Sequence, residues 1–346
     1  MQALANGSLE ATDRLQTHLD GCLGCRACEP VCPARVPYHL ILDAGRARLV
    51  EVRPQPGLAR WIRVLTHPVS QRLAAWGAWM WRISRLGPWA ARQPRLRLLS
   101  LLPATPAKRR PKLNAQIDAQ ALAVWRFGTC VGAALDPDTD RAAAAVLAAL
   151  GITSTALRGG CCGALAQHAG FSTLAADQSA ALARATGGRP IISLASGCAA
   201  QLQAHTDVAL RAQHHELLAF IRQHWPSDPR CAPLNLRVAI HRPCTHRNAL
   251  RSDGDIDWLL DQIPGITRVE LGPDDACCGA AGHHLLAHPA IADGHLAPKL
   301  AAAVRLAPDV IVSSNIGCAT HIAGGLRRQG DQTIEVMHPV ALLARA

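Results

Sequence analysis

Four cysteines near the N-terminus follow one another at short, fixed intervals. Cys22, Cys25, Cys28 and Cys32 form the pattern C-x2-C-x2-C-x3-C, and Pro33 comes directly after the last of them. Bacterial ferredoxins hold a [4Fe–4S] cluster with this run, because the tight spacing lets thiolates converge on one face of the cluster. Zinc sites usually pair two C-x2-C knuckles that lie much farther apart. The spacing therefore predicts a [4Fe–4S] cluster on these four residues.

Eight further cysteines fall into two sets that repeat one pattern. The first set is Cys130, Cys161, Cys162 and Cys198, and the second is Cys244, Cys277, Cys278 and Cys318. Corresponding members lie 114, 116, 116 and 120 residues apart, and each copy contains Cys-Cys-Gly-Ala followed later by Gly-Cys-Ala. Packing alone hardly explains a duplicated cysteine pattern, because a buried cysteine is otherwise an ordinary small apolar residue. We expect each set to hold a further cluster. The alternative that one set has lost its cluster is left open.

Short β-rich segments alternate with helical segments around these cysteines, as in parallel sheets with crossover helices. The expected strands are Leu122–Thr129, Ile152–Leu157, Pro190–Ala195, Leu236–His241, Thr267–Leu271, Asp309–Ser313 and Thr333–Met337. The expected helices are Thr139–Leu150, Leu174–Ala185, His214–Gln223, Asp255–Gln262 and Ala297–Leu306. The cysteines follow strands, and the carboxyl ends of strands in an open α/β sheet are where ligands bind. We therefore expect three loops in each copy to bring four thiols together, and the two copies to pack about a pseudo-two-fold axis.

The composition is that of a folded protein in a reducing compartment. The 346 residues are 49% hydrophobic and 18% charged, which excludes a disordered chain. Thirteen cysteines in short spacings favour metal binding over disulfides. No apolar run approaches the roughly 18 residues of a membrane-spanning helix, and no secretory signal is recognisable. These features predict a cytoplasmic protein, with peripheral association on the inner face of the cytoplasmic membrane left open.

Positive charge is concentrated in one tryptophan-rich stretch. Residues 46–112 contain 13 Arg and 2 Lys against one acid, Glu51, a net charge of +14 in a chain of +11. Two interpretations remain open: an anchor in the lipid headgroup layer, or a linker and helix packed on partner subunits. Nucleic-acid binding is not expected, because no recognition motif accompanies the charge.

These patterns divide the chain into four parts. We expect a ferredoxin-type [4Fe–4S] segment at 1–50 and a basic helical linker at 51–118. Two repeated domains follow, at 119–230 and 231–346. The expected fold class is an α+β ferredoxin-like fragment followed by α/β domains with small parallel sheets. Cys231 belongs to neither set and is expected to be a free thiol.

The chain resembles the family of iron–sulfur subunits of bacterial glycolate oxidase, which carry paired Cys-Cys-Gly (CCG) domains. The resemblance is carried by His18–Pro33, Gly159–Gly163, Ser196–Cys198, Ala276–Gly282 and Asn315–Cys318. It implies an electron-transfer subunit of a glycolate dehydrogenase complex, which oxidises glycolate to glyoxylate. Electrons would pass from FAD on flavin-binding partner subunits, through [4Fe–4S] clusters here, towards a quinone, and no residue of this chain would be catalytic.

The resemblance also leaves alternatives. Related iron–sulfur subunits serve lactate and glycerol-3-phosphate dehydrogenases, and a heterodisulfide reductase-like subunit would be catalytic itself. Heterodisulfide reductase domains end in C-x-x-C, where this chain has Gln201 and His321 three residues after the last cysteine of each set. Four cysteines per site in place of five favour plain electron transfer, and His321 is expected on the surface or at a helix cap. Some relatives have Cys-Pro-Cys where Arg242 stands here, which leaves the ligands of the second site open.

The family normally carries two ferredoxin runs, and this sequence shows one. In two-run ferredoxins the fourth cysteine of each run binds the other cluster. Either Cys32 completes the local cluster, or a further run lies upstream of the present start. We expect the second arrangement, because the opening residues resemble the segment between the two runs.

Overall fold

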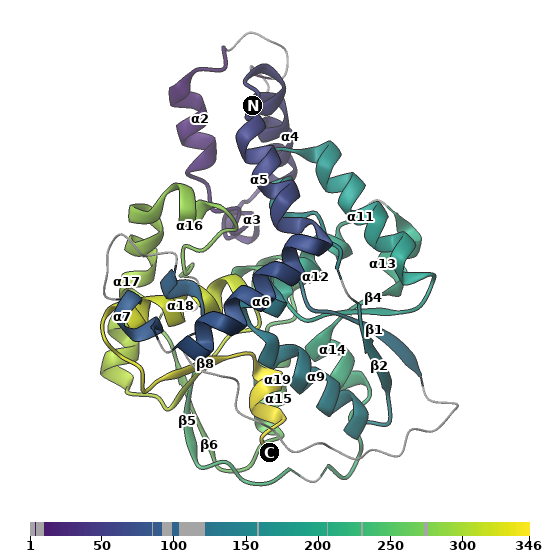
Figure 1. The fold of residues 1–346 in the computed structure, drawn as a ribbon, viewed down its shortest axis with the longest axis vertical. Helices are drawn as coiled ribbons and strands as arrows, with labels where there is room; N and C mark the ends of the chain where they lie inside the picture. The colour runs from purple at the N-terminus through teal and green to yellow at the C-terminus, as the bar shows by residue number, and fades with distance from the viewer. Residues whose placement is uncertain are drawn as a thin grey trace.

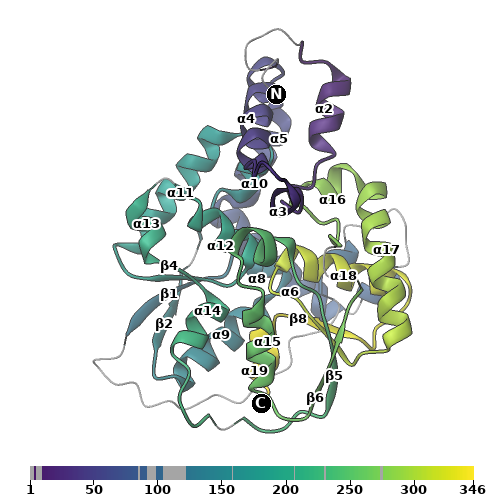
Figure 2. The same cartoon turned by 180° about the vertical axis from the view of Figure 1, so that it is seen from behind.

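Two four-stranded sheets lie side by side below a group of N-terminal helices (Figure 1; Figure 2 gives the view from behind). The computed structural model describes residues 4, 10–84, 86–91, 99–103, 122–157, 159–205, 207–229, 231–272 and 276–346. The part of the expected linker at 104–118 lies outside these residues.

Both sheets are entirely parallel and share one topology. The strand order is β2-β1-β3-β4 in the first sheet and β6-β5-β7-β8 in the second. The strands are β1 Ala123–Phe127, β2 Thr153–Ala156, β3 Ile191–Ser193, β4 His214–Glu216, β5 Leu236–Ile240, β6 Ile266–Glu270, β7 Val310–Val312 and β8 Glu335–Met337. The central strands β3 and β7 are buried throughout, as expected for parallel strands covered on both faces. The expectation of two repeated α/β domains is confirmed.

The prediction of one helix from His214 to Gln223 is wrong at its start. The first three of these residues form β4, which pairs with β3, and the helix α14 begins only at Leu217. A three-residue strand carries no readable periodicity, so pairing with a neighbour decides its conformation. The carboxylate of Glu216 then accepts hydrogen bonds from Leu218 N and Ala219 N at 2.7 and 3.0 Å and caps the helix.

Helices connect the strands of both repeats. The first repeat contains α8 Gly132–Leu135, α9 Pro137–Ala149, α10 Ala164–His168, α11 Ser172–Thr186, α12 Ser196–Gln203, α13 Val208–Gln213 and α14 Leu217–Gln223. The second contains the π-helix η2 Thr245–Leu250, then α15 Gly254–Asp261, α16 His284–Ala287, α17 Pro289–Leu306, α18 Ile316–Arg328 and α19 Pro339–Leu343. α17 starts earlier than expected and continues through Pro298.

The two repeats pack reciprocally. The last helix of the first repeat, α14, contacts the first long helix of the second, α15, and α19 contacts α9 in the same way. The helices that follow the cysteines pair likewise, α12 with η2 and α18 with α8. This reciprocity is what a pseudo-two-fold relation requires. One buried core joins both repeats; its members include Val124, Ile192, Leu217, Val238, Ile256 and Val340.

The N-terminal segment is helical where the structure describes it. Its elements are α2 Asp13–Asp20, α3 Cys28–Val31 and α4 Tyr38–Val52, so residues 10–52 lack the strands expected of a ferredoxin-like fragment. The Thr12 hydroxyl caps α2 by accepting Leu15 N at 3.2 Å. The buried Arg46 of α4 donates to the carbonyl oxygens of Leu19 and Cys22 at 2.7 Å each. This arginine therefore ties the cysteine loop to its supporting helix.

The tryptophan-rich stretch forms α5 Pro56–Thr66, α6 Pro68–Ser84 and α7 Gly87–Ala91. α6 packs on α8 and buries Ala78 and Arg82. Large apolar side chains of this stretch remain exposed; they include Leu73, Trp76, Trp79, Met80, Ile83 and Trp89. None of the described helices is both long enough and apolar enough to cross a membrane.

Candidate functional site

The structure brings each set of four cysteines into one row of sulfur contacts. In the first repeat, thiol hydrogen bonds link Cys130 to Cys161, Cys161 to Cys162, and Cys162 to Cys198. The four residues come from the loops after β1 and β2 and from the first turn of α12, which follows β3. Three loops at the carboxyl edge of one sheet therefore supply four thiols, as the sequence predicts.

The second repeat has the same arrangement. Cys244 contacts Cys277, Cys277 contacts Cys278, and Cys278 contacts Cys318. The second cysteine of each vicinal pair is buried, and Cys318 is buried as well. Four clustered thiols shielded from water are a donor set that an iron–sulfur cluster requires. The residues therefore fit such a group in both repeats.

Backbone amides support the first cysteine of each vicinal pair. Gly163 N donates to the sulfur of Cys161 at 3.4 Å, and Gly279 N donates to the sulfur of Cys277 at 3.3 Å. Both glycines have positive φ, 84° and 82°. A Cβ there would meet a carbonyl oxygen at 2.6 or 2.5 Å, so the turn accepts only glycine. Amide hydrogen bonds to sulfur are one means by which proteins set cluster potentials.

Neighbouring thiols also stabilise the thiolate form of these two cysteines. Hydrogen bonds from Cys130 and Cys162 lower the pKa of Cys161 to about 4. Hydrogen bonds from neighbouring thiols likewise lower the pKa of Cys277. Because the thiolate is the form that binds metal, these lowered pKa values favour Cys161 and Cys277 as cluster ligands.

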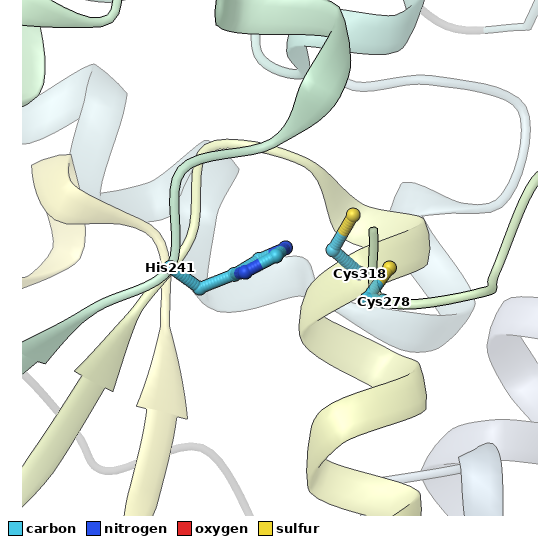
Figure 3. Close-up of side chains that lie close together, drawn as sticks. All are labelled: His241, Cys278 and Cys318. Atoms are coloured by element: carbon cyan, nitrogen blue, oxygen red, sulfur yellow. The ribbon is translucent and has the colours of Figure 1, made fainter. Parts of the chain in front are cut away.

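The two sites differ in one neighbour that the sequence analysis missed. His241, the first residue after β5, is buried, and its ring lies within 4.8 Å of the sulfurs of Cys278 and Cys318 (Figure 3). A hydrogen bond from Cys278 chiefly lowers the pKa of Cys318 to about 6, and the nearby ring of His241 acts in the same direction. The first repeat has Gly128 directly after β1. The available signal was the position of His241 at a strand end, just before the second set.

The N-terminal cysteine loop lies against the second CCG site. Asn248 of η2 donates its side-chain amide to the carbonyl oxygen of Cys25 at 2.8 Å. Burial raises the pKa of Cys25, and the charges of Cys277, Cys22 and Cys28 add to this effect. The structure thus gathers three thiols of the ferredoxin-type run near one CCG set. Cys32 follows as the residue that ends α3 and is half-buried.

His321 is buried within α18, not on the surface or at a helix cap as expected. Its Nδ1 donates to the carbonyl oxygen of Cys278 at 3.0 Å, and Nε2 lies 3.6 Å from a carboxylate oxygen of Asp293. The ring therefore braces the CCG loop through the backbone. Arg242 lies away from any ligand role, because its guanidinium binds Asp257 and Glu270 at 2.6 and 2.7 Å.

Two repeats of a cysteine-rich α/β unit, each with a row of four thiols, define the class of CCG-domain proteins. The family model of the CCG "Cysteine-rich domain" matches residues 124–203 and 238–323. The "Glycolate oxidase iron-sulfur subunit" of Escherichia coli K12 is 31% identical over 95% of this chain and 83% of that protein. The "Probable glycolate oxidase iron-sulfur subunit" of Bacillus subtilis 168 is 26% identical over 100% of this chain and 86% of that protein. The "Lactate utilization protein A" of Shouchella clausii is 26% identical over 39% of this chain and 56% of that protein.

The chain belongs to the family of glycolate oxidase iron–sulfur subunits. The resemblance seen in the sequence is therefore confirmed.

Proposed function

We propose that this chain is the electron-transfer subunit of a glycolate oxidase complex, which oxidises glycolate to glyoxylate. The observation that carries the proposal is the pair of four-thiol rows, one per repeat and each with two buried and two half-buried cysteines, with the ferredoxin-type loop beside the second. The three cysteine groups, Cys22 to Cys32 among them, would hold [4Fe–4S] clusters. The clusters would supply one-electron transfer, and the protein would hold them, exclude water and set their potentials.

The contacts suggest an order for electron flow. The charges of Cys25 and Cys277 influence each other, so the N-terminal and second sites are neighbours. The second and first repeats meet through Ser196 N, which donates to the carbonyl oxygen of Ser314 at 3.0 Å. We therefore place the second site between the N-terminal loop and the first site.

The partners are taken from the resemblance to glycolate oxidase iron–sulfur subunits. FAD would reside on flavin-binding subunits, which remove two electrons and two protons from glycolate, and a quinone would accept the electrons. We place the complex in the cytoplasm, at the inner face of the membrane. The four parts 1–50, 51–118, 119–230 and 231–346 remain our proposed division of the chain.

The experiment below distinguishes this function from two alternative functions. A lactate or glycerol-3-phosphate dehydrogenase would use the same relay, and relatives named for lactate utilization share part of this chain. A catalytic heterodisulfide reductase-like role is less favoured, because Gln201 and His321 stand where a fifth cysteine would be.

The test uses the anaerobically isolated complex with its clusters. Glycolate, D-lactate, L-lactate and glycerol 3-phosphate are added separately, and cluster reduction is followed by visible absorbance and EPR. Reduction by glycolate alone is the expected result. Reduction by another substrate only would overturn the assignment to glycolate while keeping the relay.

A matched pair of variants tests the ligands directly. Cys161→Ser should lower the iron content by about four atoms per chain, the iron of one cluster. Cys231→Ser, outside both sets, should leave the iron content unchanged. Equal iron in both variants would remove the first set from the proposed relay.

A further inference from the structure

Three buried ionisable side chains meet where the two repeats join. Glu216 ends β4, His246 lies in the π-helix η2, and Asp255 lies in the first turn of α15. One ligand atom of each, a carboxylate oxygen or a ring nitrogen, lies within 4.8 Å of those of the other two. All three side chains are buried. We call these residues the junction cluster, because they join a strand of the first repeat to two helices of the second.

Two atoms of the junction cluster, Glu216 Oε1 and His246 Nε2, are buried without a hydrogen-bond partner among the described residues. The other carboxylate oxygen, Oε2, accepts hydrogen bonds from Leu218 N and Ala219 N. It lies 3.9 Å from His246 Nε2, too far for a hydrogen bond. Glu216 is 7% exposed and His246 0%. Since buried polar atoms almost always have a partner, these two indicate a place for a bound ion.

Contacts from outside the junction cluster hold two of its members in place. The Ser314 hydroxyl bonds His246 Nδ1 at 2.7 Å, which leaves Nε2 on the side of Glu216. Arg222 donates to Asp255 Oδ1 at 2.8 Å. Histidines that bind metal usually have the second ring nitrogen bonded to an oxygen or a water, and carboxylate ligands are hydrogen-bonded in turn. The junction cluster thus has the supporting contacts of a metal site.

Negative charge is in excess at this junction. The carboxyl groups of Glu216 and Asp255 lie close together, and the acid Asp253 acts on His246 as well. The cation paired with Asp255 is Arg222, whose side chain is 54% exposed, so water screens its charge. Burial lowers the pKa of His338, the ring nearest to His246 in charge terms, to about 3, which leaves it neutral. A bound dication would offset the excess of negative charge.

The donor types select the ion. One imidazole and two carboxylates suit Zn²⁺, which binds nitrogen and oxygen at about 2.0–2.2 Å, whereas Mg²⁺ and Ca²⁺ prefer oxygen alone. Two such bonds span up to about 4 Å. This span matches the 3.9 Å between Glu216 Oε2 and His246 Nε2. One zinc ion can therefore bridge the two repeats at this point.

The first repeat shows that the architecture itself does not call for these residues. Gly132 stands two residues after Cys130, where His246 stands two residues after Cys244. The helix that corresponds to α14 is α19, and its cap is His338, which accepts Val340 N at 3.1 Å. A helix cap at this position therefore needs no carboxylate. The repeated fold does not explain the acid and the imidazole of the junction cluster.

We propose that Glu216, His246 and Asp255 bind a Zn²⁺ ion that clamps the two repeats together. The ion would fix the end of β4 against η2, which begins one residue after Cys244 of the second CCG set. None of the three ligands is a cysteine, so this zinc is distinct from any metal in the CCG sets. The ion has a structural role without redox chemistry, and the proposal does not depend on the relay function or on glycolate.

Zinc analysis of the intact protein tests the proposal. The anaerobically isolated holoprotein is treated with a chelator under conditions that leave its iron content unchanged, and Zn²⁺ is then titrated back. The wild type should bind a single zinc ion per chain, and its melting temperature should rise by several degrees, because the ion binds the folded state. A wild type that binds no zinc would overturn the proposal.

Two matched variants locate the ion. Glu216→Gln keeps the size of the side chain and an oxygen for the helix cap but loses the charge, so zinc binding should weaken about 100-fold or more. Asp261→Asn removes an acid of α15 whose side chain is 55% exposed, and it should bind zinc as the wild type does. Equal zinc affinity in Glu216→Gln and the wild type would contradict the site.

X-ray absorption at the zinc edge identifies the ligands. Zinc in the junction cluster should have nitrogen and oxygen neighbours at about 2.0–2.2 Å, whereas zinc in a cysteine site would have sulfur at about 2.3 Å. Sulfur neighbours would refute the proposal.

A further variant covers a failure of Glu216→Gln to fold. Ser314→Ala keeps all three ligands but releases His246 Nδ1, so it should weaken zinc binding about tenfold or more at unchanged iron content. Unchanged zinc affinity in Ser314→Ala would rule out His246 as a ligand.

Removal of the ion leaves its place to a proton. In the metal-free protein, burial raises the pKa of the Glu216 carboxyl to about 7. The pH dependence of stability that Glu216 confers is therefore measured on the chelator-treated protein.

Discussion

Single residues make the two CCG sites chemically unequal. Both have four cysteines and a glycine amide on the first of the vicinal pair. Among the residues that the structure describes, the second has an imidazole, that of His241, beside its sulfurs (Figure 3), whereas Gly128 follows the corresponding strand in the first. A donor to a ligand sulfur stabilises the more negative, reduced cluster. The second site should therefore have the higher potential of the two, all else being equal.

Replacing His241 should change one potential alone. We expect His241→Phe to lower the midpoint potential of the second cluster by tens of millivolts, because an N–H donor near Cys318 is lost. An EPR-monitored redox titration of the isolated holoprotein measures the shift. His241→Gln keeps an N–H donor and should recover part of the potential. A uniform shift of all clusters, or none, would contradict this role.

At the scale of elements, both repeats form the same tight turn after the vicinal cysteine pair. Gly163 and Gly279 have nearly the same φ. A Cβ on either glycine would lie too close to a helix carbonyl oxygen, that of Ala175 for Gly163 and that of Ala292 for Gly279. The turn thus packs the CCG loop directly on α11 or α17. The need for glycine at these positions therefore comes from the helix backbone that packs against the turn.

An added methyl group tests this packing. Gly279→Ala should destabilise the protein by about 2 kcal/mol or more, since it combines a left-handed backbone with a contact at 2.5 Å. Thermal denaturation of the holoprotein reports the loss. Gly187→Ala has the same kind of backbone, φ 56°, but open space around it, so it should cost about 1 kcal/mol. Equal losses would show that backbone strain alone matters.

A second element-scale feature is the buried acid that caps α14. Burial raises the pKa of Glu216 to about 7, against hydrogen bonds from Ala219 N and Leu218 N that lower it. The neighbouring His246 Nε2 lies 3.9 Å from its carboxylate, and burial lowers the pKa of His246 to about 4, so the ring is neutral. A carboxylate oxygen of Asp255 lies within 4.8 Å of both groups.

This raised pKa predicts a pH dependence of stability. The folded state binds the proton of Glu216 more tightly than the unfolded state, so its contribution is complete below about pH 4 and is lost as pH rises through 7. Glu216→Gln stays neutral, and its melting temperature relative to the wild type should rise between pH 5 and pH 9. The complete loss of this contribution corresponds to about 3 kcal/mol of folding free energy. A difference independent of pH would refute the raised pKa.

At the scale of the whole molecule, charge and apolar surface coincide on one stretch. Residues 46–112 carry a net charge of +14, while the rest of the chain sums to −3. The same stretch exposes Trp76, Trp79 and Trp89 at 54–62%. Basic and aromatic side chains together suit an anionic lipid surface. We therefore favour the membrane interpretation over a linker and helix packed on partner subunits.

Vesicle binding tests this interpretation. The holoprotein should sediment with vesicles that contain anionic lipid and much less with neutral phosphatidylcholine, and added salt should weaken binding. Replacing Trp76 and Trp79 by Ser should reduce binding about tenfold. Val304→Ser changes an exposed apolar residue of α17 and should have no effect. Binding that ignores lipid charge and the tryptophans would favour a protein partner instead.

The sequence by itself determined the repeat, the parallel sheets and the grouping of cysteines. Spacing and period are local properties, and they are enough to place Cys130 or Cys244 at a strand end. Only the tertiary structure decided what surrounds those thiols. His241 meets its sulfurs, β4 forms beside β3, and Glu216 meets His246 and Asp255 because distant segments pack where the repeats join. Such neighbours arise from packing between segments far apart in the chain, which no spacing along it encodes.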